Sequence, residues 1–304
     1  MSNSALGLAA LLAGVSLLHA DDWPQWLGPK RDAVWREAGI VEKFPKGGPK
    51  FRWRVPVNPG FSGPAVAGGR VFVTDRKLAQ GAKVNEEDPF DLSVVAGSER
   101  VLCLDEASGQ PLWQHEYPAP YGMSYNSGPR ATPVVSVSDG RVFTLGAEGH
   151  LLCLNAKDGR VIWARQFKKD FGVKTPLWGF AAHPLLDGDK LICLVGGNGT
   201  AAVAFHKDTG KELWRWGTWN PTRIGHWRLV PSPVAADGIV LACAPKDSPV
   251  YAVKLGGRGT LTTKDLAWQS FVQTTEDPAK AARSLETKDL SSDVPTPVHY
   301  QGRF

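Results

Sequence analysis

The chain has 304 residues, and its 33 glycines, 23 prolines and 12 tryptophans suit a β-rich protein with many turns. The formal net charge of +5 arises from 35 basic and 30 acidic residues interspersed along the sequence, as on a mixed solvated surface. Because the basic residues form no cluster with interleaved aromatics, we predict no nucleic-acid partner.

The first 20 residues have the pattern of an export signal. Ala5 to Leu18 is apolar but too short to span a bilayer comfortably. It ends at His19-Ala20, although no Lys or Arg precedes it and Leu18 would stand three residues before the cut. We predict a signal peptide at 1–20, a periplasmic or secreted location and no transmembrane segment after signal removal.

After an N-terminal extension, predicted at 21–50, four segments repeat nearly one motif, and each ends on a tryptophan. They are RVLCLDEASGQPLW (100–113), HLLCLNAKDGRVIW (150–163), AAVAFHKDTGKELW (201–214) and the stretched VYAVKLGGRGTLTTKDLAW (250–268). The tryptophans lie 50, 51 and 54 residues apart. Such spacing, made of strands and tight turns, is typical of a propeller or another repeat array.

Each repeat contains short β-rich runs, and none has a helical period. The first run follows a proline, at Gly63-Pro64, Thr132-Pro133, His183-Pro184 and Ser232-Pro233. A second apolar run follows a turn that contains glycine. The motif supplies two more strands, which are joined by a turn of Asp, Asn or Lys with Gly. We predict four-stranded antiparallel blades. Strands apolar on both faces fit stacked blades better than a sandwich, and the connections are too short for a parallel sheet with helices.

Three segments depart from the repeat. The polar stretch Asp75 to Glu99 is predicted to be a surface loop within the first blade. Phe271 to Ser292 is a second excursion, in which 277–283 could form a short helix with Asp277 at its N-cap. Asp293 to Phe304 matches the start of a fifth repeat.

The repeated motif A/C-x-D-x-x-T-G-x-x-x-W resembles the repeat of the pyrroloquinoline-quinone-type (PQQ-like) propellers. The likeness covers Asp22 to the end, and the opening Asp22-Trp23-Pro24-Gln25-Trp26 is similar to secreted members from planctomycete-type bacteria. In that family a tryptophan packs on a small residue of the neighbouring blade. The resemblance assigns the small residues Cys103, Cys153, Ala204 and Ala252 and the structural tryptophans Trp113, Trp163, Trp214 and Trp268.

The resemblance implies a ring of seven or eight blades. Phe51 to Val57 is similar to a lone outermost strand, with Trp53 at the tryptophan position. We therefore expect an all-β, incomplete propeller at 51–304, with four full blades and the start of a fifth, C-terminally truncated by about 100–200 residues. The alternative is a complete four- or five-bladed protein.

The four cysteines have no spacing typical of a metal site or a redox motif. Cys103 and Cys153 occupy the same small position in two repeats, and Cys193 and Cys243 lie in apolar runs. We predict buried thiols without a disulfide and no metal site.

Two functions remain open because a propeller is a scaffold for many activities. The first is a non-catalytic periplasmic scaffold, similar to the outer-membrane assembly lipoprotein of this fold, with no cofactor. The alternative is a PQQ-dependent quinoprotein dehydrogenase that uses calcium and oxidises an alcohol or a sugar. Its catalytic Asp, calcium site and adjacent cysteines are not recognisable in the sequence, so no catalytic residue is assigned.

The candidate binding residues lie in loops that enter the innermost strands, which should form one rim of the propeller. They are Tyr125, Arg130, Trp178, His183, Trp227 and Arg228. Arg pairs with carboxylate or phosphate and Trp stacks on apolar or sugar faces, so an acidic peptide or a glycan is the predicted ligand. The competing interpretation is that the aromatics only pack blades and that His183 is a structural histidine.

Overall fold

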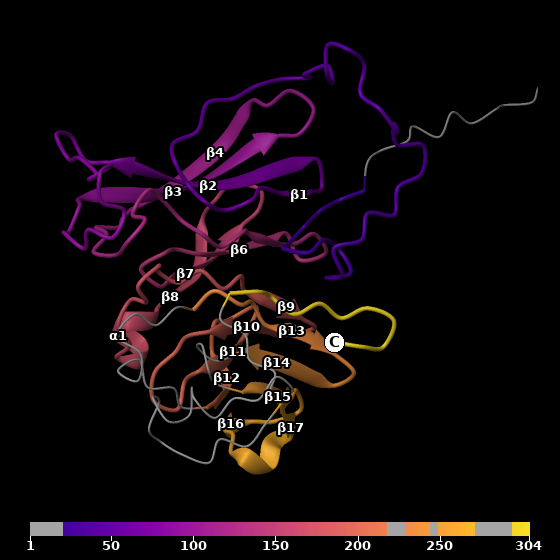
Figure 1. Ribbon diagram of the computed structural model, residues 1–304, viewed down its shortest axis with the longest axis vertical. Coiled ribbons are helices and arrows are strands. Elements are labelled where there is room, and N and C mark those ends of the chain that lie inside the picture. The colour runs from indigo at the N-terminus through magenta and orange to yellow at the C-terminus, as the bar shows by residue number, and fades with distance from the viewer. Residues whose placement is uncertain (1–20, 218–228, 244–248, 271–293) are drawn as a thin grey trace, which may run out of the picture.

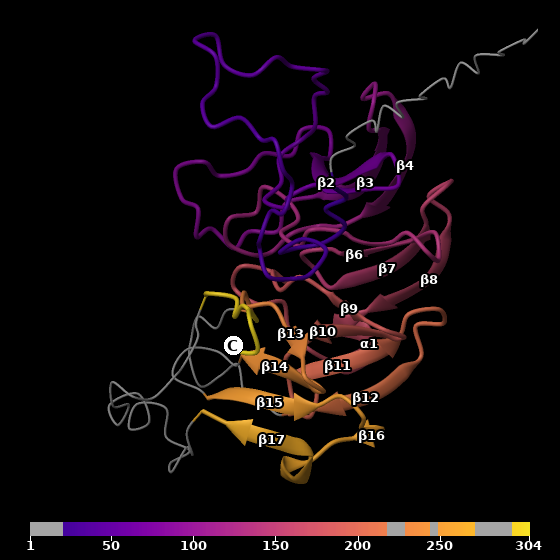
Figure 2. The same cartoon turned by 90° about the vertical axis from the view of Figure 1, so that its right-hand side faces the viewer.

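The computed structural model describes residues 21–217, 229–243, 249–270 and 294–304. Four antiparallel sheets stack in chain order, which confirms the predicted β-propeller blades (Figures 1 and 2). Blade 1 contains β1 (Ala65–Ala67), β2 (Arg70–Leu78), β3 (Gly97–Asp105) and β4 (Pro111–Pro118). Blade 2 contains β5 (Val134–Ser136), β6 (Arg141–Leu145), β7 (His150–Asn155) and β8 (Val161–Gln166).

Blade 3 contains β9 (Leu185–Asp187), β10 (Lys190–Leu194), β11 (Ala202–His206) and β12 (Glu212–Trp216). Blade 4 contains β13 (Val234–Ala236), β14 (Ile239–Cys243), β15 (Val250–Lys254) and β17 (Leu266–Gln269). A short strand, β16 (Gly259–Thr260), leaves blade 4 and pairs in parallel with β12 of blade 3. The central strands β7 and β10 are buried on both faces, as stacked blades require.

The turn that joins the last two strands explains the glycine in each motif. In blade 2, Asn155 donates its backbone N–H to the Arg160 carbonyl, and its side chain accepts from Lys157 N at 2.8 Å. Gly159 then adopts φ of +73°, a left-handed conformation that glycine takes without a Cβ penalty. The equivalent Gly109 and Gly210 have φ of +72° and +65°. The same residue types therefore produce the same turn in blades 1, 2 and 3.

The register within each blade corrects one expectation. The small residue of the motif lies directly opposite the tryptophan of its own blade, in the pairs Cys103–Trp113, Cys153–Trp163, Ala204–Trp214 and Ala252–Trp268. The neighbouring blade instead contributes its turn glycine. A Cβ added to Gly159 would lie 2.5 Å from the Trp113 ring, and one added to Gly210 would lie 2.7 Å from the Trp163 ring. Only glycine lets the ring approach this closely.

Each of these rings is also fixed by a hydrogen bond. Trp113 Nε1 donates to the Ala156 carbonyl at 2.9 Å, and Trp163 Nε1 donates to the Lys207 carbonyl at 2.8 Å. Trp53, which belongs to no described strand, makes the same contact with blade 1 through the Glu106 carbonyl and Gly109. It thus takes the tryptophan position predicted for it. We call these contacts the outer seam.

The four repeat tryptophans differ in burial. Trp214 is fully buried, whereas Trp113 and Trp163 are half-buried and Trp268 is 41% exposed. We expected these tryptophans to be buried in equivalent positions, but Trp113 on β4 and Trp163 on β8 are less buried than Trp214 on β12.

All four cysteines lie in the described chain and are buried thiols outside any disulfide, as predicted. Burial raises the pKa of Cys153 to about 12 and raises the pKa of Cys103 and Cys193 as well. These thiols act as small core groups, and their raised pKa values leave them protonated and unreactive at neutral pH.

The insertion in blade 1 is shorter than the sequence predicted. Strands β2 and β3 pair up to Leu78 and Gly97, so the loop itself covers 79–96. Arg76 and Glu99, predicted to be on the surface, are buried. Glu99 accepts hydrogen bonds from the hydroxyls of Tyr117 and Tyr121, and a third from Ala147 N at 2.9 Å. Their partners compensate the burial of these charges, so the polar sequence did not mark an exposed segment.

Two short helices were not predicted. Helix α1 (Phe167–Phe171) follows β8, and a 3₁₀ turn, η2 (Thr263–Asp265), precedes β17. The helix predicted at 277–283 lies outside the described residues. Among the residues that the structure describes, no helix has the length and apolar character needed to cross a membrane.

The N-terminal extension runs along the inner edges of the blades. Trp23 bridges to Val66 in β1, and the Pro24 carbonyl accepts from Val135 N in β5 at 2.8 Å. Arg31 reaches β9 of blade 3, where it donates to the Leu186 carbonyl at 3.4 Å. The extension therefore helps to form the surface on which the rim loops meet.

Candidate functional site

In blades 2, 3 and 4, the residue before the proline of the repeat takes part in a chain of hydrogen bonds from one blade to the next. Thr132 N donates to His183 Nδ1 at 2.7 Å, and His183 N donates to Ser232 Oγ at 2.8 Å. Ser232 N then donates to Thr296 Oγ1 at 3.0 Å. We call this chain of bonds the inner seam. It explains why the segment predicted to start a fifth repeat lies beside blade 4, although it forms only an isolated bridge.

His183 therefore connects its own blade to blade 2 through its side chain and to blade 4 through its backbone N–H. Its Nδ1 accepts a backbone N–H, so this nitrogen carries no proton in the folded chain. The indole of Trp26 stacks on its imidazole at a centroid distance of 4.3 Å with an interplanar angle of 8°. Burial lowers the pKa of His183 to about 4. The histidine is neutral at physiological pH and offers a flat ring edge rather than a charge.

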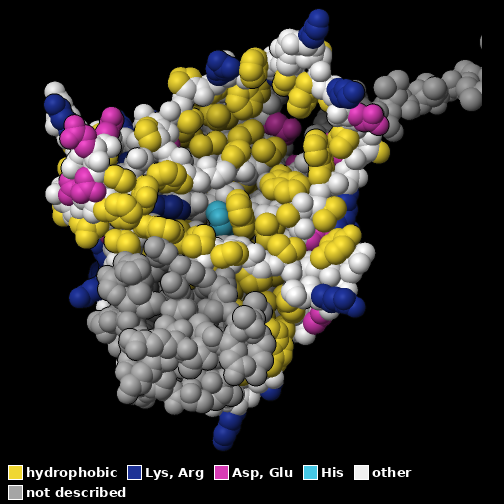
Figure 3. Space-filling view, in the orientation of Figure 1, with side chains coloured by type: hydrophobic (Ala, Val, Ile, Leu, Met, Phe, Trp, Pro, Cys, Tyr) yellow, Lys and Arg dark blue, Asp and Glu magenta, His cyan; other side chains and the backbone are white. Residues whose placement is uncertain are grey.

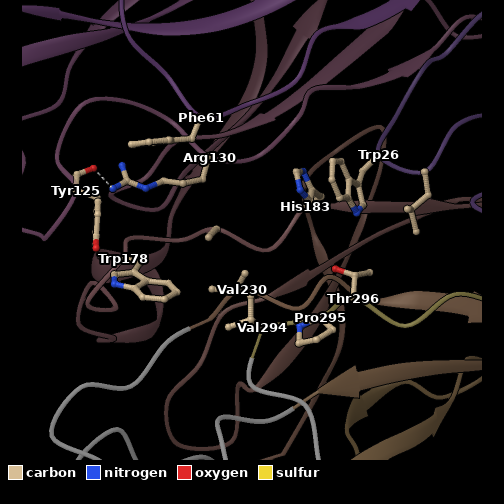
Figure 4. Close-up of a pocket in the computed structure, with 12 residues that line it drawn as sticks. Trp26, Phe61, Tyr125, Arg130, Trp178, His183, Val230, Val294, Pro295 and Thr296 are labelled. Carbon is tan, nitrogen blue, oxygen red and sulfur yellow. Dashed lines mark hydrogen bonds between the residues drawn. The ribbon is translucent and has the colours of Figure 1, made fainter. Parts of the chain in front are cut away.

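A pocket of about 630 Å³ opens beside this histidine, at the loop ends of the innermost strands. Arg130, Tyr125 and Trp178 form one side, and His183 and Trp26 form the other (Figure 4). Apolar groups of Val230, Val294 and Pro295 complete it, together with Phe61, Leu27, Ala181 and Thr296. Hydrophobic side chains cover a broad band of the face shown in Figure 3. Such a concave, aromatic lining is typical of a ligand or partner site.

Tyr125 has an unusual conformation for its residue type. Its φ is +52°, and the residue is 41% exposed. The ring meets Trp178 edge to face at 6.1 Å and Phe90 at 5.4 Å. A non-glycine residue in this region costs free energy, so the surrounding bonds must hold it there. Tyr125 N donates to the Pro89 carbonyl at 2.7 Å.

Arg130 has its donors directed into the protein. Its Nη1 donates to the Gly128 carbonyl, and Nη2 donates to the carbonyls of Ser124, at 3.1 Å, and Tyr125. The side chain is buried, its guanidinium lies over the Phe61 ring at 5.2 Å, and burial lowers its pKa. Arg130 therefore shapes the loop that presents Tyr125. With both terminal nitrogens engaged, it is poorly placed to receive the carboxylate of an acidic ligand.

The structure thus brings together four of the six predicted residues, Tyr125, Arg130, Trp178 and His183. Trp227 and Arg228 lie outside the described residues. Sequence reasoning missed Trp26, Phe61 and Val294, which come from the extension, the approach to β1 and the last segment. Only Trp26 had a signal, because it stands in the opening motif that resembles secreted propellers.

Outside this pocket we looked for groups of metal-ligating or buried ionisable side chains among the described residues. Within the described ranges, no group of three or more His, Cys, Asp or Glu side chains could hold a metal ion. The buried carboxylates Glu99 and Glu148 both have partners; Glu148 accepts from Lys168 Nζ at 2.5 Å and from Thr175 Oγ1 at 2.6 Å. These contacts assign both carboxylates to the packing of blades 1 and 2.

Comparison with known proteins identifies the family. The PQQ-type repeat family described as outer membrane protein assembly factor BamB matches residues 97–289, more than half of the chain. The chain belongs to this family of β-propellers.

Individual relatives are distant. Outer membrane protein assembly factor BamB of Shewanella oneidensis is 24% identical over 183 residues, which cover 55% of this chain and 36% of that protein. The chain thus spans about a third of the length of this curated relative. The structure of BamB from Moraxella catarrhalis is 14% identical, with 63% of each chain covered and a TM-score of 0.31. Quinohemoprotein alcohol dehydrogenase from Comamonas testosteroni is 15% identical, covering 77% of this chain and 35% of that one, with a TM-score of 0.43.

Proposed function

We propose that this chain is a non-catalytic periplasmic scaffold that binds an apolar segment of a partner protein in the rim pocket. The observation that carries the proposal is the pocket lining itself. Trp26, Phe61, Tyr125 and Trp178 offer aromatic surface, and Val230, Val294 and Pro295 add aliphatic surface. Aromatic anchors in a rigid, concave setting are the usual hot spots of protein interfaces.

The polar groups of the pocket favour an apolar partner over the acidic peptide or glycan that the sequence predicted. The terminal nitrogens of Arg130 donate to three carbonyls, and His183 Nδ1 accepts from Thr132 N. Three of the five N–H donors of Arg130 are therefore used within the protein, which leaves fewer of them for a sugar or a carboxylate. Apolar side chains would gain from burial without that competition.

Hydrogen bonds hold part of the described rim in place, which lowers the ordering cost of binding there. The inner seam connects Thr132, His183 and Ser232, and Arg130 ties its own loop together. Loops held in this way lose little conformational freedom on binding, so more of the burial energy appears as affinity. The family's description as an outer membrane protein assembly factor agrees with a scaffold that recognises other proteins.

Selection of peptides tests the proposal. A library of random peptides is panned on the wild-type chain and on Trp178→Ala, and melting temperature is measured for both. We expect enriched peptides to be apolar or aromatic and to lose binding to Trp178→Ala. Trp35→Ala is the matched control, because Trp35 is 59% exposed and lies outside the pocket.

Two results would contradict the scaffold. Peptides that bind wild type and Trp178→Ala equally would remove the pocket from the proposal. Dye-linked oxidation of an alcohol or a sugar that requires added PQQ and calcium would establish the quinoprotein alternative instead. We expect no such activity and no bound cofactor.

Location is tested separately. If the first 20 residues are an export signal, the chain expressed in a Gram-negative host should appear in the periplasmic fraction. N-terminal sequencing should then begin at Asp21. Recovery in the cytoplasm with the first 20 residues attached would contradict the periplasmic part of the proposal.

A further inference from the structure

The insertion loop 79–96 of blade 1 is physically joined to the rim pocket. Phe90, near its tip, packs edge to face on Tyr125, which packs in turn on Trp178 of the pocket wall. The Pro89 carbonyl accepts from Tyr125 N at 2.7 Å. These contacts extend the aromatic surface from the pocket onto the loop.

The loop is held in place from below. Val95 and Tyr121 exchange two backbone hydrogen bonds, at 2.8 and 3.0 Å, and buried Arg76 donates to the Val95 carbonyl at 2.7 Å. Gly122 passes beneath the loop, where an added Cβ would lie 3.3 Å from Val94. A long insertion anchored in this way presents its surface in a defined conformation.

That surface combines exposed apolar groups with negative charge. Phe90, Leu92 and Val94 are 55%, 53% and 75% exposed. The loop also carries the carboxylates of Glu86, Glu87, Asp88 and Asp91 and only one cation, Lys83. Acidic side chains gather at the edge of the apolar band in Figure 3.

The acids of the loop divide into two roles. Asp88 accepts from Phe90 N at 2.9 Å and Asp91 accepts from Ser93 N at 2.8 Å, so both shape the loop. The carboxylates of Glu86 and Glu87 are exposed and have no hydrogen bond or ion pair to any described residue. Two glutamates beside an apolar strip are placed to attract cations.

We propose that the insertion loop selects the partner: it binds a segment whose apolar run enters the rim pocket and whose Lys or Arg residues meet Glu86 and Glu87. The inference rests on the proposed function, which it deepens by naming the chemistry of the partner. The charge of the loop disfavours an anionic lipid surface, because its four carboxylates would face negative headgroups.

Three labelled peptides test the inference by fluorescence anisotropy. All share one apolar and aromatic run, which is followed by lysines in the first, glutamates in the second and serines in the third. On the wild-type chain we expect the lysine peptide to bind about three- to tenfold more tightly than the serine peptide, and the glutamate peptide to bind most weakly. High salt should reduce these differences because it screens exposed charges.

The variant Glu86→Lys/Glu87→Lys should abolish or reverse the preference while it leaves the serine peptide unchanged. The matched control, Glu42→Lys/Glu106→Lys, changes net charge equally at two glutamates that lie outside the pocket and the insertion loop. It should keep the preference. Melting temperatures of both variants show whether they fold.

The outcomes separate the two proposals. If the serine peptide binds and Trp178→Ala abolishes this, but lysine confers no gain or the gain survives Glu86→Lys/Glu87→Lys, the inference is overturned and the scaffold proposal stands. If no peptide binds wild type, or Trp178→Ala binds all three as wild type does, the pocket proposal fails and the inference fails with it.

Discussion

The junctions between blades 1, 2 and 3 differ from the junction between blades 3 and 4, although a tryptophan stands at each. Trp113 and Trp163 each cover a turn glycine of the next blade and donate to a carbonyl there. Trp214 is more deeply buried, but its Nε1 has no hydrogen-bond partner among the described residues. The stretched motif of blade 4 has removed the turn that would supply one.

Blade 4 replaces that turn with a different contact. Its extra residues form β16, which pairs in parallel with β12, and Leu261 N donates to the Arg215 carbonyl at 2.8 Å. Thus one blade adds a strand to the edge of the other. Apolar packing therefore maintains the tryptophan position at every junction, while the hydrogen bond and the glycine belong to the tight turn and disappear with it.

The largest effect should come from removing the most buried ring. Trp214→Ala is expected to cost about 3–5 kcal/mol of unfolding free energy, because it leaves a cavity in the main core. Trp163→Ala should cost less, since its ring is half-buried. Denaturant unfolding of both variants checks this order. Equal costs would mean that burial does not distinguish the two junctions.

The turn glycines should be the next most sensitive positions. Gly159→Ala is expected to cost about 2–3 kcal/mol, because it combines a left-handed backbone with a Cβ that collides with Trp113. Gly256→Ala is the control in blade 4, where an added Cβ meets no atom within 4 Å. It should change stability by less than about 0.5 kcal/mol. A tolerated Gly159→Ala would refute the close packing of the outer seam.

The inner seam should respond to pH at one junction only. The pKa of His183 is lowered from 6.5 to about 4 in the folded chain, so the unfolded state binds its proton first. Stability should therefore fall as pH decreases from about 6.5 to about 4, by about 2–3 kcal/mol for this group. Burial also lowers the pKa of His115 and His150, which adds a loss of the same sign.

A variant isolates the contribution of His183. In His183→Asn the side-chain oxygen can still accept from Thr132 N but does not titrate. Its free energy of unfolding should depend less steeply on pH between about 6.5 and 4 than that of wild type. Identical slopes would show that His183 titrates normally and that the bond to Thr132 N is not held in solution. Ser232 and Thr296 give the next junctions no comparable pH dependence.

The sequence predicted the structural features that recur in every blade, but few of the features that occur once, such as the pocket. The four motifs gave the strands, the blade order, the place of Trp53 and the buried thiols, because each depends on local pattern. The pocket depends on contacts between distant segments: Trp26 reaches His183 across 157 positions of chain, and nothing local indicates this. The prediction that Arg76 and Glu99 lie on the surface was wrong for another reason. Whether a charged side chain can be buried depends on its hydrogen-bond partners, which the hydropathy of the sequence does not indicate.

Replacing the tryptophans by phenylalanine should change the free energy of unfolding least, and it distinguishes the two kinds of junction most directly. Trp163→Phe removes a donor to the Lys207 carbonyl and should cost about 1 kcal/mol. Trp214→Phe also loses contacts, but it removes a buried N–H that has no partner among the described residues, and the two effects should nearly cancel.

The order of the two sites should therefore reverse between the alanine and phenylalanine series. With alanine, burial decides and Trp214 is the more costly position. With phenylalanine, the hydrogen bond decides and Trp163 becomes the more costly one. Parallel unfolding curves of the four variants measure this directly. If Trp214→Phe destabilises the chain more than Trp163→Phe does, the predicted reversal is wrong, and removal of the unpartnered N–H of Trp214 does not offset the ring contacts that are lost.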